Sequence, residues 1–191
     1  MLKLKGSEFE ADILFRANKL EMSGILTMGR YGVQARMIKN EKTGDPEWKI
    51  IPSLPDLEGV IAPSGRQIII EAKVCSQASY PIYQTDKKRP KQIDHMLDRA
   101  RFGAVCYFII HFNARDLLTK SDPAETFAIL VDGREHFWRL YQSGAIRSLS
   151  RSDAALYGKR IPWNLYSTRA SKETPDLTCL LPENFNQPEL L

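Results

Sequence analysis

Two side chains of opposite charge stand close together in an isoleucine-rich stretch of the chain. Glu71 and Lys73 occur near the end of residues 66–74, whose apolar composition is typical of a strand covered on both faces. Side chains alternate along a strand, so Glu71 and Lys73 share one face while Ile70 and Ala72 point to the other. A carboxylate and an ammonium are costly to bury unless they pair or carry out chemistry. The pair is therefore a candidate catalytic site.

A second carboxylate precedes this strand. Asp56 opens residues 56–61, which we expect to pair with residues 66–74 as a hairpin through the turn at 63–65. This pairing would bring Asp56 next to Glu71, and two adjacent carboxylates repel each other unless a cation lies between them. Such oxygen ligands suit Mg²⁺, which also binds phosphate. With Lys73 in reach of water and phosphate, the residues predict metal-dependent hydrolysis of a phosphodiester.

The same residues allow a purely structural interpretation. Glu71 and Lys73 could form a surface ion pair, with Asp56 a turn residue after Pro55, because an isolated Glu-x-Lys is common. In this chain, however, Asp56 is followed fifteen positions later (71 minus 56) by Glu-Ala-Lys at the end of an Ile-rich strand. That arrangement favours the catalytic interpretation.

Two more polar residues are candidates for the same site. Gln92 opens an expected helix at 91–102, from which it could reach over the sheet toward the site or lie exposed in the first turn. Glu10 lies in an expected helix at 7–23. It could complete a capping box with Ser7 or turn a third carboxylate toward the metal, and the spacing favours the cap.

The elements that must position these residues describe one α/β domain spanning 1–191. The two helices carry apolar residues at helical spacing, and strands are expected at 56–61, 66–74, 104–112 and 126–131. Residues 25–38 contain short β-prone pieces, and the polar, turn-rich residues 39–55 are expected to leave the core. Residues 162–191 are broken by prolines and predict an irregular tail. The order of elements predicts a central mixed β-sheet flanked by helices.

Composition and charge are those of an ordinary soluble globular protein. The 191 residues are 43% hydrophobic and 26% charged, and no apolar run approaches the roughly 18 to 20 residues that span a bilayer. The start of the chain has no signal-peptide pattern, and its three cysteines are scattered, so we expect reduced thiols in a cytoplasmic protein. Their spacing does not fit a structural zinc site.

Basic residues cluster without dominating the chain. The densest cluster holds Lys87, Lys88, Arg89 and Lys91. The net charge of +4 permits a polyanionic partner without requiring one, and on charge alone a solvated surface is the simpler explanation. The three histidines are expected to pack in the core or to lie on the surface rather than to bind a metal.

A longer series of motifs runs from about Gly6 to Phe112. It comprises Gly6-x-x-Phe9-Glu10 with Asn18, Asp56-x-x-Gly59-Val60, Glu71-Ala72-Lys73, Tyr80-Pro81-Ile82, Gln92-Ile93-x-x-Met96, and Gly103-Ala104 before an apolar strand. Taken together, these motifs resemble those of the RecU-type Holliday junction resolvases. Two positions depart from that pattern: Pro55 stands where a threonine is expected, and Lys91 where a histidine is usual.

The resemblance implies a restriction-endonuclease-like, PD-(D/E)XK core and a homodimer. It also implies dependence on Mg²⁺, for which Mn²⁺ may substitute, and symmetric cleavage of four-way DNA junctions. Residues 34–55 match a stalk that protrudes into the junction centre in that family.

By position, the resemblance also assigns roles to single residues. Asp56 and Glu71 are expected to bind the metal together with the carbonyl of Ala72. Lys73 is expected to assist the nucleophile, and Glu10 and Gln92 to complete the site. The residues expected to contact DNA are Lys87, Lys88, Arg89, Lys91, Arg30 and Lys39.

Two other functions stay open. The same core could serve a restriction or repair endonuclease that cuts duplex or flap DNA, or the chain could be a non-catalytic junction-binding relative. All three of Asp56, Glu71 and Lys73 are present, which argues against the non-catalytic relative. Relatives that have lost activity usually lack one of the catalytic residues.

Overall fold

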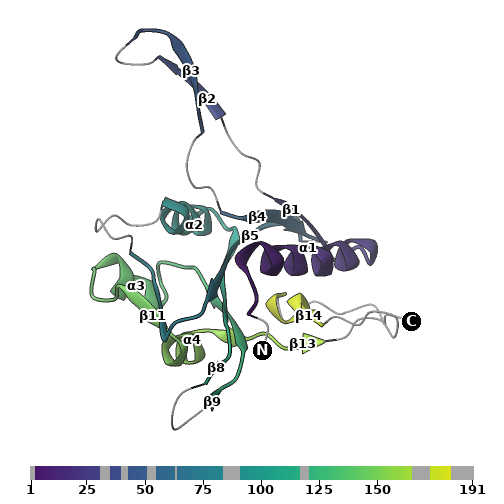
Figure 1. The fold of residues 1–191 in the computed structure, drawn as a ribbon. Coiled ribbons are helices and arrows are strands. Elements are labelled where there is room, and N and C mark those ends of the chain that lie inside the picture. The colour runs from purple at the N-terminus through teal and green to yellow at the C-terminus, as the bar shows by residue number, and fades with distance from the viewer. Residues whose placement is uncertain are drawn as a thin grey trace.

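The computed structural model describes residues 3–30, 35–39, 43–50, 55–62, 64–83, 91–116, 121–164 and 173–181. At its centre is a six-stranded sheet in the order β1-β4-β5-β7-β10-β12 (Figure 1). Its strands are β1 Leu26–Arg30, β4 Leu57–Ile61, β5 Arg66–Cys75, β7 Val105–Phe112, β10 Glu125–Leu130 and β12 Lys159–Arg160. β5 and β7 run parallel, and the other neighbouring pairs of this sheet are antiparallel. The predicted α/β fold with a mixed sheet is confirmed.

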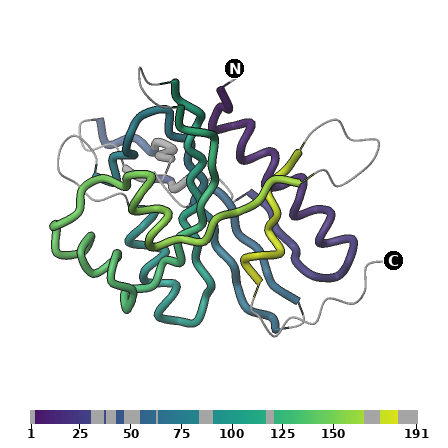
Figure 2. The backbone as a smooth tube through the Cα atoms, turned by 90° about the horizontal axis from the view of Figure 1, so that it is seen from below, coloured from purple at the N-terminus to yellow at the C-terminus, as the bar shows by residue number. Residues whose placement is uncertain are grey.

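Helices cover both faces of this sheet (Figures 1 and 2). One face carries α1 Gly6–Met22 and the C-terminal pieces β13 Trp163–Asn164, β14 Thr174–Pro175 and the 3-10 helix η1 Leu177–Leu180. The other face carries α2 Lys91–Arg101, α3 His136–Gln142 and α4 Arg151–Tyr157. Each face has its own hydrophobic core.

The apolar stripe predicted on the first helix lies in one of these cores. Phe9, Ile13, Ala17 and Leu20 recur three or four positions apart on α1 and are at most 1% exposed. Burying a side chain as large as Phe9, Ile13 or Leu20 contributes about 1.5–3 kcal/mol to stability. The spacing of apolar residues therefore explains both why α1 forms and which side of it faces the sheet.

The start of α1 differs from the prediction. The residue before the helix is Lys5 rather than Ser7, and the carboxylate of Glu8 accepts a hydrogen bond of 3.0 Å from the backbone N–H of Lys5. The predicted capping box of Ser7 and Glu10 is therefore wrong. Because the helix begins at Gly6, Glu8 stands where a box partner is needed, and Glu10 is left for another role.

The hairpin that was predicted to position the candidate site is confirmed. β4 and β5 are antiparallel, from Leu57 opposite Ile70 to Ile61 opposite Arg66. Gly65 turns the chain with φ +67°, a conformation that suits glycine. At Gly59 a Cβ atom would lie 1.9 Å from the carbonyl oxygen of Thr27 on β1, so only glycine fits where these strands meet. Close packing of β1 on β4 thus depends on a residue of the Gly59-Val60 motif.

The apolar stretch of β5 is covered on both faces, as predicted. Ile68, Ile69 and Ile70 are at most 1% exposed, although neighbouring side chains point to opposite faces. Ile68 and Ile70 belong to the core under α1, and Ile69 belongs to the core under the other helices. The first half of β5 is therefore a structural strand.

Besides the β13–β14 pair, three short strand pairs of the described residues lie outside the central sheet. They are β2 Ala35–Lys39 with β3 Pro46–Ile50, β6 Ser79–Pro81 with β11 Ser148–Ser150, and β8 Arg115–Asp116 with β9 Ser121–Asp122. The β2–β3 hairpin projects away from the sheet beyond β1 and β4 (Figure 1). The excursion expected at 39–55 thus contains a regular strand, and its use as a stalk stays a prediction.

The segment expected to be an irregular tail contains ordered pieces that pack on α1. Thr174, Leu177 and Leu180 are buried, and the guanidinium of Arg16 pairs with the carboxylate of Asp176 at 3.5 Å. Tertiary packing, rather than local pattern, orders residues 173–181. Among the described residues, no helix is both long and apolar enough to cross a membrane.

Candidate active site

The candidate site lies where β4 ends and β5 continues. The β4–β5 pairing ends at Leu57 and Ile70, whereas β5 runs on to Cys75 beside β7. On the side where β4 has ended, Asp56 forms hydrogen bonds to β5 in place of a neighbouring strand. Its Oδ2 accepts a hydrogen bond of 2.9 Å from the backbone N–H of Ala72, and its own N–H donates to Glu71 Oε2 at 3.2 Å. Asp56 is therefore held by β5 through both its backbone and its side chain.

Lys73 joins the two carboxylates. Its Nζ lies 3.1 Å from Asp56 Oδ2 and 2.5 Å from Glu71 Oε1. The side chain of Glu71 is 2% exposed, whereas those of Asp56 and Lys73 are 22% and 27% exposed. Glu71 thus lies at the floor of the site, with Asp56 and Lys73 at its mouth. The structure brings together the three residues on which the sequence prediction depends, and we call them the charged cluster.

Burial and charge act against each other in the charged cluster. Burial raises the pKa of Glu71 from 4.5 to about 7; Lys73 opposes this rise and the Asp56 carboxylate adds to it. For Lys73, burial alone would lower the pKa, but Glu71 and Asp56 outweigh it and raise the pKa above its ordinary value. Lys73 is therefore a permanent cation near neutral pH, while Glu71 holds its charge poorly without further positive charge.

The donor set of the site suits a hard divalent cation. Asp56 Oδ1 takes part in no hydrogen bond among the described residues. The carbonyl of Ala72 points to the same open edge of β5 as its N–H, because both groups of a strand residue face one side. Two carboxylates and a carbonyl are oxygen ligands of the kind that Mg²⁺ accepts while it retains several waters. Within the described ranges no three His, Cys, Asp or Glu side chains group together, so a metal here would depend on backbone, water and phosphate ligands.

Glu10 lies at the same end of the sheet as Asp56. Its Oε2 is 3.9 Å from a guanidinium nitrogen of Arg30, and Arg30 lies directly opposite Leu57 in the β1–β4 register. Asp56 is the residue before Leu57. The position of Glu10 is thus compatible with a third carboxylate near the site, and this role stays a prediction.

The other residues expected at the site are placed less closely. Gln92 and Lys91 begin α2, where Gln92 is partly exposed and Lys91 is exposed. The hydrogen bonds of the described residues include none from Gln92 to the charged cluster. Lys39 ends β2, and Arg30 is exposed at the end of β1. Three expected DNA contacts, Lys87, Lys88 and Arg89, lie outside the described residues.

Sequence reasoning missed the position of Tyr80. Burial raises the pKa of its hydroxyl, and the charges of Lys73, Glu71 and Asp56 also affect that pKa, so the hydroxyl lies within electrostatic range of the charged cluster. Tyr80 lies on β6, opposite Leu149 of β11, and its ring centroid is 5.9 Å from that of Phe108. The Tyr80-Pro81-Ile82 motif was the only signal, because the pairing with β11 is remote in sequence.

No protein-family model matches this chain, and no curated protein matches it in sequence. Among solved structures it is similar to Hjc of Archaeoglobus fulgidus, a Holliday junction resolvase from an archaeal hyperthermophile. The TM-score is 0.45 at 15% sequence identity, and the match covers 81% of this chain and 95% of that one. This likeness is distant in both backbone and sequence.

Proposed function

We propose that the chain is a metal-dependent DNA endonuclease that hydrolyses phosphodiesters with water. The supporting observation is the contact of the Lys73 ammonium with both Asp56 and Glu71, 3.1 and 2.5 Å away, on a strand in which three buried isoleucines precede Glu71. A structural ion pair needs only one carboxylate and gains little by burying a second. Two carboxylates with one ammonium at a partly open strand edge are better explained by phosphate chemistry.

Each residue of the charged cluster has a distinct task in this proposal. Asp56 and Glu71, with the carbonyl of Ala72, would hold Mg²⁺ or Mn²⁺. When bound, this ion supplies Lewis acidity toward water and phosphate. Because its pKa is raised, Lys73 acts as a cation and not as a base: it orients the attacking water and stabilises the negative charge that develops on the phosphate.

The substrate proposed for this chemistry is a four-way DNA junction, cut by a homodimer. Support comes from the resemblance of the motifs to the RecU-type resolvases and from the β2–β3 hairpin, which projects from the sheet within residues 34–55. Lys87, Lys88, Arg89 and Lys91 would grip the DNA backbone, with Arg30 and Lys39 nearer the hairpin. Affinity would then fall steeply with salt, because phosphate contacts release counterions. Glu10 and Gln92 would complete the site.

The decisive experiment is a cleavage assay on a synthetic four-way junction, beside linear duplex, with Mg²⁺, with Mn²⁺ and without metal. The wild type should cut the junction only with metal, whereas Asp56→Asn and Lys73→Ala should bind it without cutting. Glu58→Gln is the matched control. Glu58 is a half-buried carboxylate on β4 that bonds only to Gln67 among the described residues, so its loss should leave cleavage intact.

The same assay separates the alternatives. Equal cleavage of linear duplex would favour a restriction or repair endonuclease. Junction binding with no cleavage in either metal would favour a non-catalytic relative. Full activity of Asp56→Asn or Lys73→Ala would contradict the proposed mechanism altogether.

A further inference from the structure

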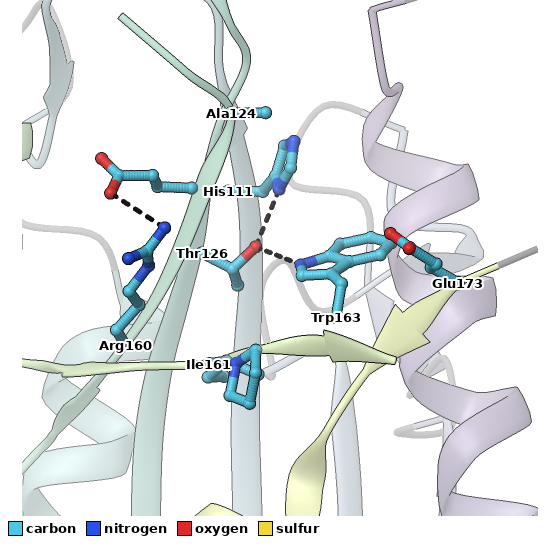
Figure 3. Close-up of a pocket in the computed structure, with 9 residues that line it drawn as sticks. His111, Ala124, Thr126, Arg160, Ile161, Trp163 and Glu173 are labelled. Atoms are coloured by element: carbon cyan, nitrogen blue, oxygen red, sulfur yellow. Dashed lines mark hydrogen bonds and ion pairs between the residues drawn. The ribbon is translucent and has the colours of Figure 1, made fainter. Parts of the chain in front are cut away.

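A cavity of about 600 Å³ opens on the α1 face of the sheet (Figure 3). Its walls come from the ends of β7 and β10 and from the chain around β12 and β13, and they include His111, Glu125, Thr126, Arg160 and Trp163. Its volume falls within the range of about 300–1,000 Å³ typical of small-ligand sites. None of these residues belongs to the charged cluster.

A chain of hydrogen bonds fixes the back wall of this cavity (Figure 3). The indole N–H of Trp163 donates to Thr126 Oγ1 at 2.7 Å, and Thr126 Oγ1 lies 2.8 Å from His111 Nδ1. Thr126 is 1% exposed and His111 is 7% exposed. We call these three residues the neutral cluster. Because its polar atoms satisfy one another, Trp163 is held in one orientation.

The ring of Trp163 is covered on one side and lines the cavity. Phe9 stacks on it with ring centroids 6.2 Å apart and planes inclined by 17°, and His111 meets it edge-on at 5.4 Å. Trp163 nevertheless stays partly exposed. A planar aromatic surface that is rigidly held and half covered is a platform on which a flat ring can stack.

The polar groups that bond to this platform, Thr126 and His111, are uncharged, whereas the carboxylate of Glu173 also lines the cavity. Burial and, to a smaller extent, the charge of Arg151 lower the pKa of His111 to about 4, so the imidazole is neutral at physiological pH. The indole N–H can only donate, so the Thr126 hydroxyl can give its own hydrogen to Nδ1, which leaves Nε2 as an N–H donor. A neutral imidazole N–H next to an aromatic face matches an acceptor atom on the edge of a nucleobase.

A cation stands at the rim of the cavity. The side chain of Arg160 is 67% exposed and pairs with Glu125 at 3.4 Å. An exposed guanidinium is well suited to contact a phosphate next to a stacked base. The cavity therefore has an aromatic surface and a neutral polar group that could contact a base. It also has a cation at its rim that could contact the phosphate of the same nucleotide.

The cavity lies close to the charged cluster but on the other face of the sheet. In the parallel β5–β7 register, His111 is opposite Val74, the residue after Lys73. Neighbouring residues of a strand point to opposite faces, and paired strands lie about 4.8 Å apart. A DNA strand that passes the charged cluster and bends around this end of the sheet would reach Trp163 within a short distance.

We infer that this cavity binds one unpaired nucleobase of a DNA strand, stacked on Trp163, with its phosphate at Arg160. The inference rests on the proposed function for the choice of DNA as the polymer, and it adds a requirement for unpaired nucleotides near the cut. The cavity would thus help to select substrates that open or splay at the cleaved strand.

The test is a binding experiment in EDTA, so that no cleavage is required. A fully paired duplex is compared with the same duplex carrying a short single-stranded arm that contains 2-aminopurine. The wild type should bind the armed duplex roughly tenfold more tightly and should quench the 2-aminopurine fluorescence, because stacking on an aromatic side chain contributes about that much per base. Trp163→Ala should lose both effects, and Trp163→Phe, which keeps a ring, should retain most of them.

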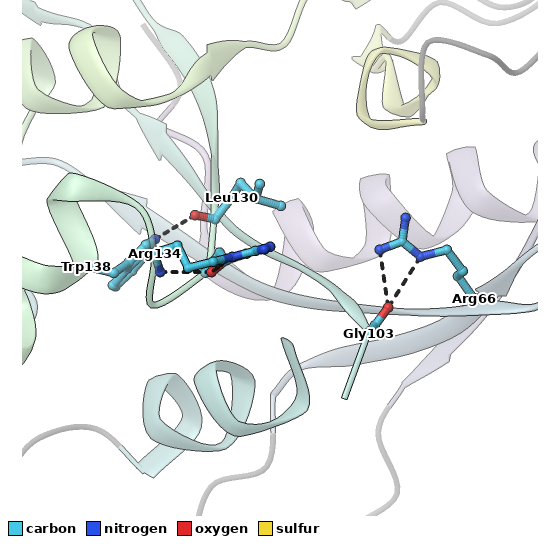
Figure 4. Close-up of polar contacts among 6 residues, drawn as sticks. Arg66, Gly103, Leu130, Arg134 and Trp138 are labelled. Atoms are coloured by element: carbon cyan, nitrogen blue, oxygen red, sulfur yellow. Dashed lines mark hydrogen bonds and ion pairs between the residues drawn. The ribbon is translucent and has the colours of Figure 1, made fainter. Parts of the chain in front are cut away.

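Two arginines provide a matched control that does not alter the packing around Trp163. Arg160→Gln should weaken binding of the armed duplex several-fold. Arg134→Gln should not, because Arg134 lies near Leu130 at the opposite end of β7, where it pairs with Asp132 (Figure 4). Both side chains are exposed and ion-paired, so neither change should unfold the chain. If Trp163→Ala is unfolded at the assay temperature, the inference is tested by the fluorescence quenching of the wild type and by the binding of the two arginine variants.

The inference is overturned if the wild type shows no preference for the armed duplex and no change in fluorescence, or if folded Trp163→Ala quenches like the wild type. Its failure can be told apart from that of the proposed nuclease. Quenching without cleavage in metal would refute the nuclease alone, and cleavage without quenching would refute the nucleobase site alone.

Discussion

The charged cluster and the neutral cluster lie at the same end of β5 and β7, on opposite faces of the sheet, and differ in the charge that they carry. In the neutral cluster one hydroxyl joins an indole and an imidazole without any net charge. In the charged cluster two carboxylates share one ammonium, and burial raises the pKa of Glu71 to about 7. The neutral cluster is therefore expected to contribute to stability, whereas burial of the Glu71 charge costs stability, a cost that the proposed chemistry would explain.

The largest effect expected from this difference is on cleavage. Glu71→Gln should lower the rate of junction cleavage by roughly a hundred- to a thousandfold, since it removes a charge that acts on the reacting phosphate and its cation. The amide can still accept from the backbone N–H of Asp56, so folding stability should not fall. Cleavage kinetics and urea unfolding of the same preparation test both parts. A variant that cuts normally, or that loses stability like a core mutant, would contradict the assignment.

The two clusters should also respond to pH in opposite directions. The pKa of Glu71, about 7 in the folded chain, exceeds its ordinary value of 4.5, so its stabilising effect is present below pH 4.5 and is lost as pH rises to about 7. The pKa of His111 is about 4 in the folded chain, below its ordinary value of 6.5. The contribution of His111 to the free energy of unfolding is therefore fully present above pH 6.5 and is lost as the pH falls to about 4. Each change amounts to roughly 3 kcal/mol.

Unfolding free energies between pH 4 and 8 measure these contributions. Relative to the wild type, Glu71→Gln should gain stability as pH rises from 4.5 to 7, and His111→Gln should gain it as pH falls from 6.5 to 4. If unfolding free energy depends on pH in the same way in the wild type and in either variant, the substituted residue does not make the pH-dependent contribution described above.

Removing the central hydroxyl of the neutral cluster should destabilise the fold. Thr126→Val keeps the shape of a side chain that is 1% exposed but leaves the Trp163 N–H and His111 Nδ1 without their partner. The expected loss is about 2 kcal/mol in denaturant unfolding. Thr27→Val is the matched control, because Thr27 is exposed and bonds only at the surface, to Glu21 at 2.9 Å; it should change stability by less than about 0.5 kcal/mol. Equal losses of unfolding free energy in both variants would contradict a structural role for the neutral cluster.

The smallest effect expected is that of metal on thermal stability. Millimolar Mg²⁺ should raise the melting temperature of the wild type by a few degrees, because an ion that binds only the folded state stabilises it by about 1 kcal/mol at a few times its dissociation constant. Asp56→Asn and Glu71→Gln should not respond, whereas Glu58→Gln should respond like the wild type. An equal rise in all four proteins would mean that the ion acts elsewhere on the surface.

The charged cluster could be predicted from sequence because it depends on local structure. Asp56 and Glu71 are joined by a single hairpin, and Lys73 follows Glu71 on the same face of one strand. The alternation of side chains and the turn at Gly65 are enough to bring the three residues together. The strands β4, β5, β7 and β10 and the helices α1 and α2 could be predicted for the same reason, whereas β12 was not.

The neutral cluster could not be predicted in this way. His111 and Thr126 meet through the β7–β10 pairing, and Trp163 joins them only after the chain has returned along β12. No local pattern encodes these long-range steps. The seven-residue helices α3 and α4 are likewise too short for helical periodicity to reveal them. At the start of α1, the box of Lys5 and Glu8 forms in place of the expected box of Ser7 and Glu10, because the helix begins at Gly6.

The register of β1 and β4 has a consequence for how such a chain can evolve. The backbone leaves the sheet after Arg30 and returns at Leu57, and these two residues lie side by side. Residues 31–55, which include the β2–β3 hairpin, are therefore an insertion between two strands whose pairing does not depend on them. This insertion could lengthen, shorten or be replaced while the pairing that positions Asp56 persists, so under the proposed function substrate preference and cleavage chemistry could diverge on separate parts of one chain.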